Sequence, residues 1–188
     1  LELARYSDIC DLLNDKSAER IYEDASAKVN SAEYSTRNLL KKVNAELVCT
    51  TEDPIDTLEF HQKLNSNPFE TKMSTAFRPD KAILISNDGY NAYLDTLGDV
   101  SGVAINTYAD LLSALRKRID FFNSNGCKLS DHGLDQIYFE NFTESEVNAI
   151  FKKKRENQTI TPEEALKFQS AVLLFLSETY HELGWVQQ

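Results

Sequence analysis

Long hydrophobic runs are absent from the sequence, and cysteine, glycine and proline are all scarce. The longest apolar run, Ala171 to Leu176, lies inside an amphipathic helical pattern and falls short of the roughly 18 residues that cross a membrane. The amino-terminal residues do not resemble a signal peptide, because polar residues follow Leu1–Arg5 at once. These absences argue against a membrane-spanning chain, and we expect a soluble globular protein with no membrane partner.

Basic residues are in the minority, with 20 Lys and Arg against 30 Asp and Glu. The formal net charge of −10 argues against nucleic acids and anionic membranes as partners, since both favour dense basic surfaces. The basic run Lys152–Arg155 falls at the carboxyl end of an expected helix, where cations are favourable, so we interpret it as a solvated surface. Binding of a small anion by such an acidic chain requires a local arginine or a helix amino terminus.

Cysteine and histidine are too few and too scattered to suggest a metal centre. The three cysteines, Cys10, Cys49 and Cys127, are far apart and odd in number, which is typical of reduced thiols. We therefore predict a cytoplasmic location and no disulfide framework. The three histidines are not spaced as metal ligands and no glycine-rich phosphate loop is present, so we expect no metal ligand and no cofactor in this segment.

The order of apolar and turn-forming residues predicts an α/β fold. The first 44 residues have helical periodicity, with Ser17 and Ser35 as candidate capping residues. From residue 45 onward, short β-branched segments alternate with helices, which predicts a parallel sheet covered by helices. The expected strands are 46–51, 72–77, 127–130 and 185–188. The first expected helix after residue 45 begins at Pro54 with Asp53 as its cap, and the next two span 87–97 and 107–125. A further helix starts at Thr143, with Glu146 in a capping box, and the last runs from Thr161 to Gly184.

We divide the chain into a helical lead-in, residues 1–44, and an α/β segment, residues 45–188. Three full strands and a fourth cut short do not close a barrel. The chain also lacks an initiating Met, and its last strand has no continuation. We therefore expect an internal fragment of a longer chain.

Three polar clusters follow the expected strands, where functional residues gather in parallel α/β folds. They are Thr50–Asp53, Phe77–Lys81 and Ser130–His132. Arg78 is a candidate for binding a carboxylate through two parallel hydrogen bonds, although pairing with Asp80 to fix a loop is the alternative. Asp131 and His132 are candidates for proton transfer or metal binding. Since adjacent strand residues point to opposite faces, only one would face a shared site, and a helix cap is the alternative role.

The same segments resemble the paired signatures of uronate isomerases. Cys49–Glu59 and Phe77–Ala82 carry the first pair, and Gly126–Asp135 continues the match. Tyr108–Leu111, Ala171–Leu176 and Gly184–Gln188 follow in the expected order. The resemblance therefore covers nearly the whole chain, more loosely at the amino-terminal helices.

The resemblance implies a member of the amidohydrolase superfamily, here as a partial (β/α)₈ TIM-barrel segment holding about strands two to four and the start of strand five. It implies aldose–ketose isomerisation of D-glucuronate to D-fructuronate and of D-galacturonate to D-tagaturonate. It assigns substrate binding to Arg78 and a catalytic position to Asp131, with Thr51, Asp53 and His132 as substrate-binding neighbours or loop-shaping residues. It also implies a divalent metal, such as zinc, in the full-length enzyme, and we expect the fragment to be inactive alone.

Two other functions compete with this hypothesis. The chain could be a non-catalytic scaffold or interaction domain derived from an amidohydrolase-like barrel, or a related hydrolase. A partial parallel sheet exposes strand edges and apolar surface, so we expect the isolated segment to self-associate. The small-molecule partner that the resemblance implies is a hexuronate.

Overall fold

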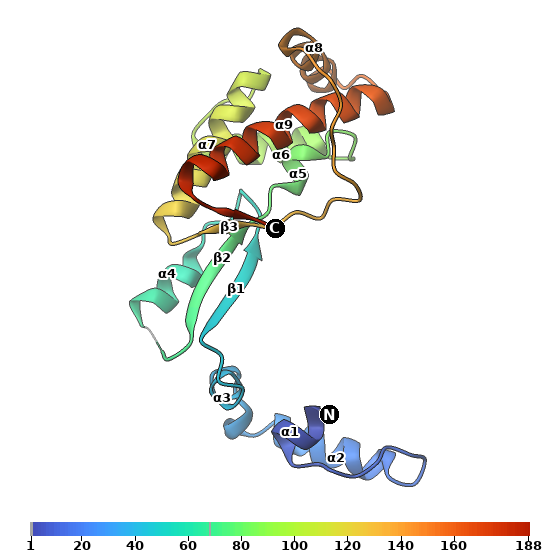
Figure 1. The fold of residues 1–188 in the computed structure, drawn as a ribbon, viewed down its shortest axis with the longest axis vertical. Helices are drawn as coiled ribbons and strands as arrows, with labels where there is room; N and C mark the ends of the chain where they lie inside the picture. The colour runs from blue at the N-terminus through green and yellow to red at the C-terminus, as the bar shows by residue number, and fades with distance from the viewer. Residues whose placement is uncertain (1, 68) are drawn as a thin grey trace. The chain divides into compact units, whose positions relative to one another are not determined.

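The computed structural model describes residues 2–67 and 69–188 (Figure 1). The chain forms two compact units, Leu1–Val48 with Asn67–Met73, and Cys49–Ser66 with Ser74–Gln188. The predicted boundary between residues 44 and 45 differs from this division and stays a prediction. All the candidate site residues belong to the second unit.

The first unit contains the helices of the lead-in. They are α1 (Glu2–Ser7), α2 (Ala18–Val29), the 3-10 helix η1 (Ala32–Tyr34) and α3 (Thr36–Lys42). The Tyr34 hydroxyl donates to the Tyr6 carbonyl at 2.8 Å, which ties η1 to α1. Ser17 and Ser35 precede helices as predicted, but neither side chain makes a capping hydrogen bond, so that part of the prediction is wrong. The Ser17 hydroxyl instead donates to the Leu12 carbonyl.

The four predicted strands form one sheet in the order β1-β2-β3-β4. The strands are β1 (Leu47–Glu52), β2 (Lys72–Phe77), β3 (Leu129–Ser130) and β4 (Val186–Gln187). β3 pairs in parallel with β2 on one side and with β4 on the other. Parallel neighbours require helical crossovers, and the chain supplies them between the strands. The carboxyl ends of β1, β2 and β3 consequently lie at one edge of the sheet (Figure 1).

Six helices belong to the second unit: α4 (Glu59–Ser66), α5 (Asp80–Ile83), α6 (Tyr90–Ser101), α7 (Tyr108–Ser124), α8 (Glu144–Arg155) and α9 (Pro162–Leu183). The predicted capping box of Thr143 and Glu146 is present at α8, and Thr107 and Thr161 form equivalent boxes at α7 and α9. Each box satisfies backbone donors that a helix start would otherwise leave unpaired. Local sequence therefore sets where these three helices begin.

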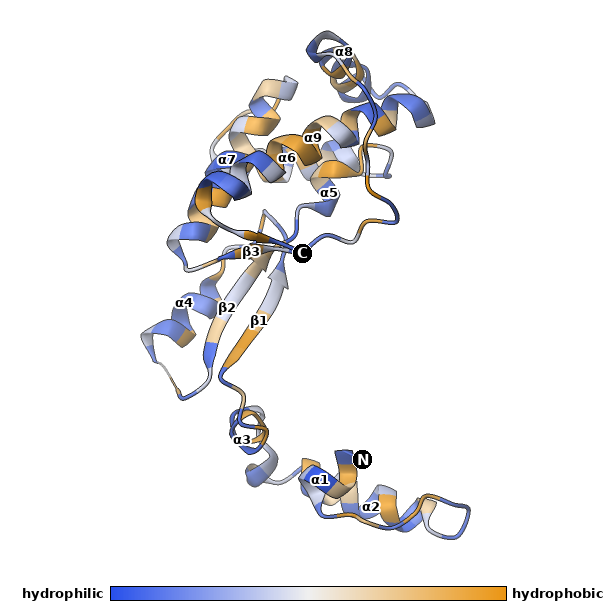
Figure 2. Ribbon diagram, viewed as in Figure 1, coloured by the Kyte–Doolittle hydropathy of each residue, from blue (hydrophilic) through white to orange (hydrophobic). Residues whose placement is uncertain are grey.

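The core lies between the sheet and helices α6, α7 and α9, whose apolar positions recur along their length (Figure 2). Phe77, at the end of β2, is fully buried and its ring centroid lies 5.0 Å from that of Phe122 in α7. The same ring lies 6.3 Å from Tyr180 of α9 and 6.1 Å from Trp185. Edge-to-face aromatic packing of this kind adds to the free energy of burial. It joins β2 to both helices directly behind the candidate site.

Two predicted helix boundaries are wrong. No helix starts at Pro54: residues 54 and 55 form a turn within an irregular segment, and α4 begins only at Glu59. Asp53 accepts a hydrogen bond from the Ile55 amide at 3.1 Å, a local turn that competes with helix formation. Gly98 does not end its helix either, because α6 continues to Ser101 and is capped by Gly102 in the left-handed conformation, with φ of 63°.

Candidate functional site

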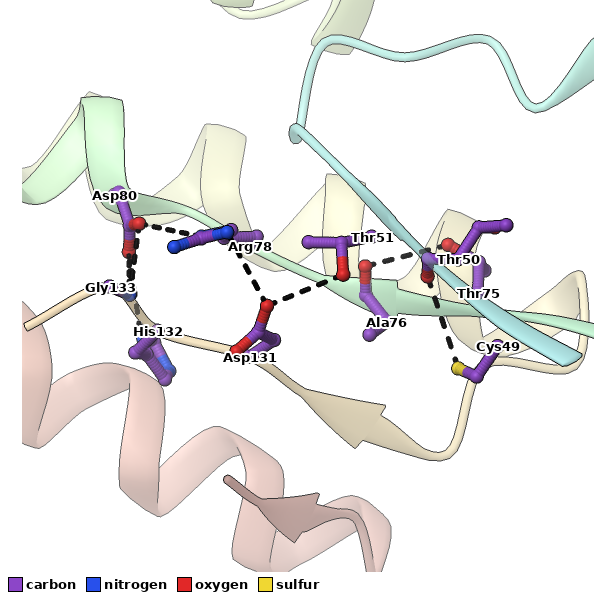
Figure 3. Close-up of polar contacts among 10 residues, drawn as sticks. All are labelled: Cys49, Thr50, Thr51, Thr75, Ala76, Arg78, Asp80, Asp131, His132 and Gly133. Carbon is purple, nitrogen blue, oxygen red and sulfur yellow. Dashed lines mark hydrogen bonds and ion pairs between the residues drawn. The ribbon is translucent and has the colours of Figure 1, made fainter. Parts of the chain in front are cut away.

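The ends of β1, β2 and β3 bring together Thr51, Arg78 and Asp131 on one face of the sheet (Figure 3). The Thr51 hydroxyl donates to Asp131 Oδ2 at 3.3 Å. Arg78 Nη1 lies 3.6 Å from the same oxygen. These side chains come from segments up to 80 residues apart in the sequence. The predicted convergence at this edge is therefore present for three of the five candidate residues.

Backbone hydrogen bonds hold the same three strand ends in register. The Arg78 amide donates to the Glu52 carbonyl at 2.9 Å, and the Asp131 amide donates to the Phe77 carbonyl at 3.0 Å. Since the backbone is fixed on both sides of Arg78, the position of its side chain depends mainly on its own rotamer and its polar contacts.

Asp80 binds one edge of the Arg78 guanidinium. Arg78 Nε donates to Asp80 Oδ2 at 2.8 Å, and the hydrogen bond and charge of Asp80 raise the pKa of Arg78 further. The Asp80 carboxylate also accepts from the Gly133 amide, at 3.2 Å to Oδ1 and 3.0 Å to Oδ2. The Arg78 side chain remains 42% exposed. The predicted alternative, a pairing with Asp80, is thus present through Nε.

Asp53 lies outside this group, in the turn after β1. Its Oδ1 accepts from the Tyr93 hydroxyl at 2.9 Å, and its Oδ2 lies 3.3 Å from Lys81 Nζ. Burial, and after it the charge of Asp53, raise the pKa of Tyr93 above its ordinary value. These contacts support the loop-shaping role for Asp53; substrate binding by Asp53 stays a prediction.

His132 points to the opposite face of β3 from Asp131, toward helix α9 (Figure 3). Its side chain is 2% exposed and its ring centroid lies 5.8 Å from that of Tyr180. Burial lowers the pKa of His132, and neither ring nitrogen has a hydrogen-bond partner among the described residues. His132 Nδ1 lies 3.9 Å from Asp80 Oδ1. The structure does not bring the His132 ring together with Thr51, Arg78 and Asp131. The role of His132 as a substrate contact stays a prediction.

Sequence reasoning missed Arg118, a buried arginine within the apolar face of α7. Arg118 is 7% exposed and donates to the carbonyls of Pro54 at 2.6 Å and Asp56 at 2.7 Å. Its guanidinium lies 4.2 Å from the ring centroid of Phe121. The side chain therefore holds the turn that follows β1. An arginine on an otherwise apolar helix face was the available signal.

Within residues 2–67 and 69–188, no three His, Cys, Asp or Glu side chains gather in a way that could hold a metal ion. The Asp131 carboxylate faces the cation of Arg78 at 3.6 Å. A divalent metal in the full-length enzyme stays a prediction. None of the helices described is sufficiently long and apolar to span a membrane.

Comparisons with known proteins match the whole chain. The family model described as glucuronate isomerase matches residues 1–188. The chain is 80% identical over 188 residues to a uronate isomerase from Flavobacterium johnsoniae and 44% identical over 189 residues to one from Phocaeicola vulgatus. Each comparison covers 100% of this chain and 40% of the relative. The chain thus spans about two-fifths of the length of these curated relatives.

Solved structures give the same result for the fold. The chain superimposes on a uronate isomerase from Thermotoga maritima with a TM-score of 0.94 and 28% identity, covering 100% of this chain and 41% of the other. A glucuronate isomerase from Caulobacter crescentus matches with a TM-score of 0.90 at 23% identity, which supports the fold alone. The prediction of an α/β fold consistent with a partial barrel is confirmed. On the family match and these relatives, the chain belongs to the uronate (glucuronate) isomerase family.

Proposed function

We propose that this chain supplies one wall of the substrate site of an enzyme that isomerises hexuronates, D-glucuronate to D-fructuronate and D-galacturonate to D-tagaturonate. The observation that carries the proposal is the half-exposed Arg78 guanidinium at the end of β2, fixed through Nε and 3.6 Å from Asp131. A uronate differs from a neutral sugar by its carboxylate, and a planar guanidinium can bind a carboxylate through two parallel hydrogen bonds.

Asp131 is the proposed catalytic residue. Isomerisation between an aldose and a ketose moves a proton between neighbouring carbons, so a base must lie close to the substrate. Asp131 is 29% exposed, and both Thr51 and Arg78 approach one of its oxygens, Oδ2. The other oxygen, Oδ1, has no such contact among the described residues and is the atom proposed to accept a proton. Thr51 and Arg78 then orient the carboxylate.

Location and assembly complete the proposal. All three cysteines are free in the structure, in keeping with a cytoplasmic enzyme. β1 is an edge strand of the sheet, and the side chains of Leu47 and Val186 are exposed, which supports self-association. Light scattering tests this part: a chain that stays monomeric at every concentration would contradict it.

The test of Arg78 uses an enzyme of the relatives' full length that carries these 188 residues. Arg78→Met should lower kcat/KM for D-glucuronate about ten- to a hundredfold, since hydrogen bonds to charged groups contribute about 1.5–3 kcal/mol. Arg78→Lys is the matched control, because it keeps the charge and loses the two-pronged geometry. Activity of the Met variant within about threefold of the unmodified enzyme would reject the assignment.

A further inference from the structure

Gly133 lies closer to Arg78 than any other residue type would allow. A Cβ atom added to Gly133 would overlap Arg78 Nη2 and would lie 2.9 Å from Asp80 Oδ2, closer than non-bonded atoms approach. The atom in the way is the far end of a flexible arginine, not backbone. A side chain at residue 133 would therefore displace the guanidinium while leaving the strands in place. Glycine here is required by the position of Arg78.

Asp80 fixes the same guanidinium from a second direction. Its carboxylate accepts from Arg78 Nε at 2.8 Å and from the Gly133 amide at 3.0 Å, so one residue that follows β2 and one that follows β3 hold it. An arginine has two edges that can meet a carboxylate, and Asp80 occupies the one that includes Nε. The other edge, formed by Nη1 and by the Nη2 that lies against Gly133, is the one that would meet a ligand carboxylate. Nη1 faces Asp131, so this edge is oriented toward the proposed catalytic carboxylate.

We infer that Asp80 and Gly133 are positioning residues that hold Arg78 in one rotamer, and that they set the selectivity for a sugar acid over its neutral analogue. The inference rests on the proposed function, because it assumes that Arg78 binds the substrate carboxylate. Neither residue is proposed to contact the substrate. Each acts by restricting the guanidinium, which lowers the entropy lost when the substrate binds.

The test measures kcat and KM for D-glucuronate and for D-glucuronamide, whose amide replaces the carboxylate, in the full-length enzyme. Gly133→Ala should raise KM for D-glucuronate about tenfold with kcat within about threefold. Turnover of D-glucuronamide should stay within about twofold. Asp80→Asn keeps the size of the side chain and removes its charge, and it should reduce the preference for the acid in the same direction. The melting temperature of the Gly133 variant should move by no more than about 2 °C.

A double-mutant cycle separates this inference from the proposed function. If Gly133 acts through Arg78, adding Gly133→Ala to Arg78→Met should change kcat/KM by less than about twofold. Loss of acid selectivity in Arg78→Met but not in Gly133→Ala or Asp80→Asn would overturn the inference and leave the proposed function standing. Unchanged selectivity in Arg78→Met would reject both. Additive losses in the double variant would show that Gly133 does not act through Arg78.

Discussion

The two faces of the sheet differ sharply where β2 and β3 end. On the open face, Arg78 and Asp131 are 42% and 29% exposed and carry opposite charges. On the helix face, Phe77 and His132, their immediate neighbours in sequence, are 0% and 2% exposed. Alternation along a strand allows adjacent residues to take unrelated roles. We expect substitutions on the helix face to change stability and those on the open face to change activity.

The largest expected effect is on the helix face. Phe77→Ala should lower the free energy of unfolding by about 3–5 kcal/mol, because it removes a fully buried ring in contact with two helices. Phe60→Ala is the control, since that ring is 68% exposed and should change stability by less than about 0.5 kcal/mol. Denaturant unfolding measures both. Equal losses in the two variants would contradict the assignment of the core.

Arg118→Met should have the next largest effect. It leaves the carbonyls of Pro54 and Asp56 without their donor and should lower the free energy of unfolding by about 1–3 kcal/mol. Arg116→Met, on the same helix, removes only exposed ion pairs with Asp120 and Glu182 and should cost less than about 1 kcal/mol. Similar values for the two variants would show that Arg118 does not hold the turn.

His132 should make stability depend on pH. Because burial lowers its pKa below the ordinary value of 6.5, the unfolded chain binds the proton more readily than the native chain. The contribution of His132 to the free energy of unfolding is fully present above pH 6.5. It is lost as the pH falls through that value toward the lowered pKa. His132→Phe, which keeps a ring against Tyr180, should reduce the fall in unfolding free energy between about pH 7.5 and 5.5. An unchanged fall would show that His132 does not titrate in this way.

The smallest expected effect compares two adjacent threonines. Thr51→Val removes the 3.3 Å hydrogen bond to Asp131 and should lower kcat/KM about two- to fivefold without changing stability. Thr50→Val is the matched control, because Thr50 lies 2.7 Å from His61 Nε2 on the other face. It should lower stability and leave kcat/KM unchanged. The reverse pattern would mean that the two faces of β1 have been assigned the wrong way round.

Local patterns in the sequence predicted part of the fold closely. β2 occupies Lys72–Phe77 as predicted, and the helix starting after Thr143 has its capping box, because both depend on residues a few positions apart. Asp53 was misassigned because its partner Tyr93 lies 40 residues away and local geometry alone also suits a helix cap. Gly98 was misassigned because packing in α6 outweighs the modest cost of a glycine inside a helix.

The candidate site was predictable only in part, because local sequence patterns do not encode contacts between residues far apart in the chain. Strand ends in a parallel sheet share an edge, so the convergence of Thr51, Arg78 and Asp131 could be expected. The roles inferred for Asp80 and Gly133 depend on a close approach across 53 residues of sequence. No composition or spacing rule encodes that distance, so only the folded structure could reveal it.

Asp131→Asn tests most directly the claim that the open face carries the chemistry. In the full-length enzyme kcat for D-glucuronate should fall about a hundredfold or more, as expected for loss of a general base, while the free energy of unfolding stays within about 0.5 kcal/mol. A kcat within about threefold of the unmodified enzyme would contradict it.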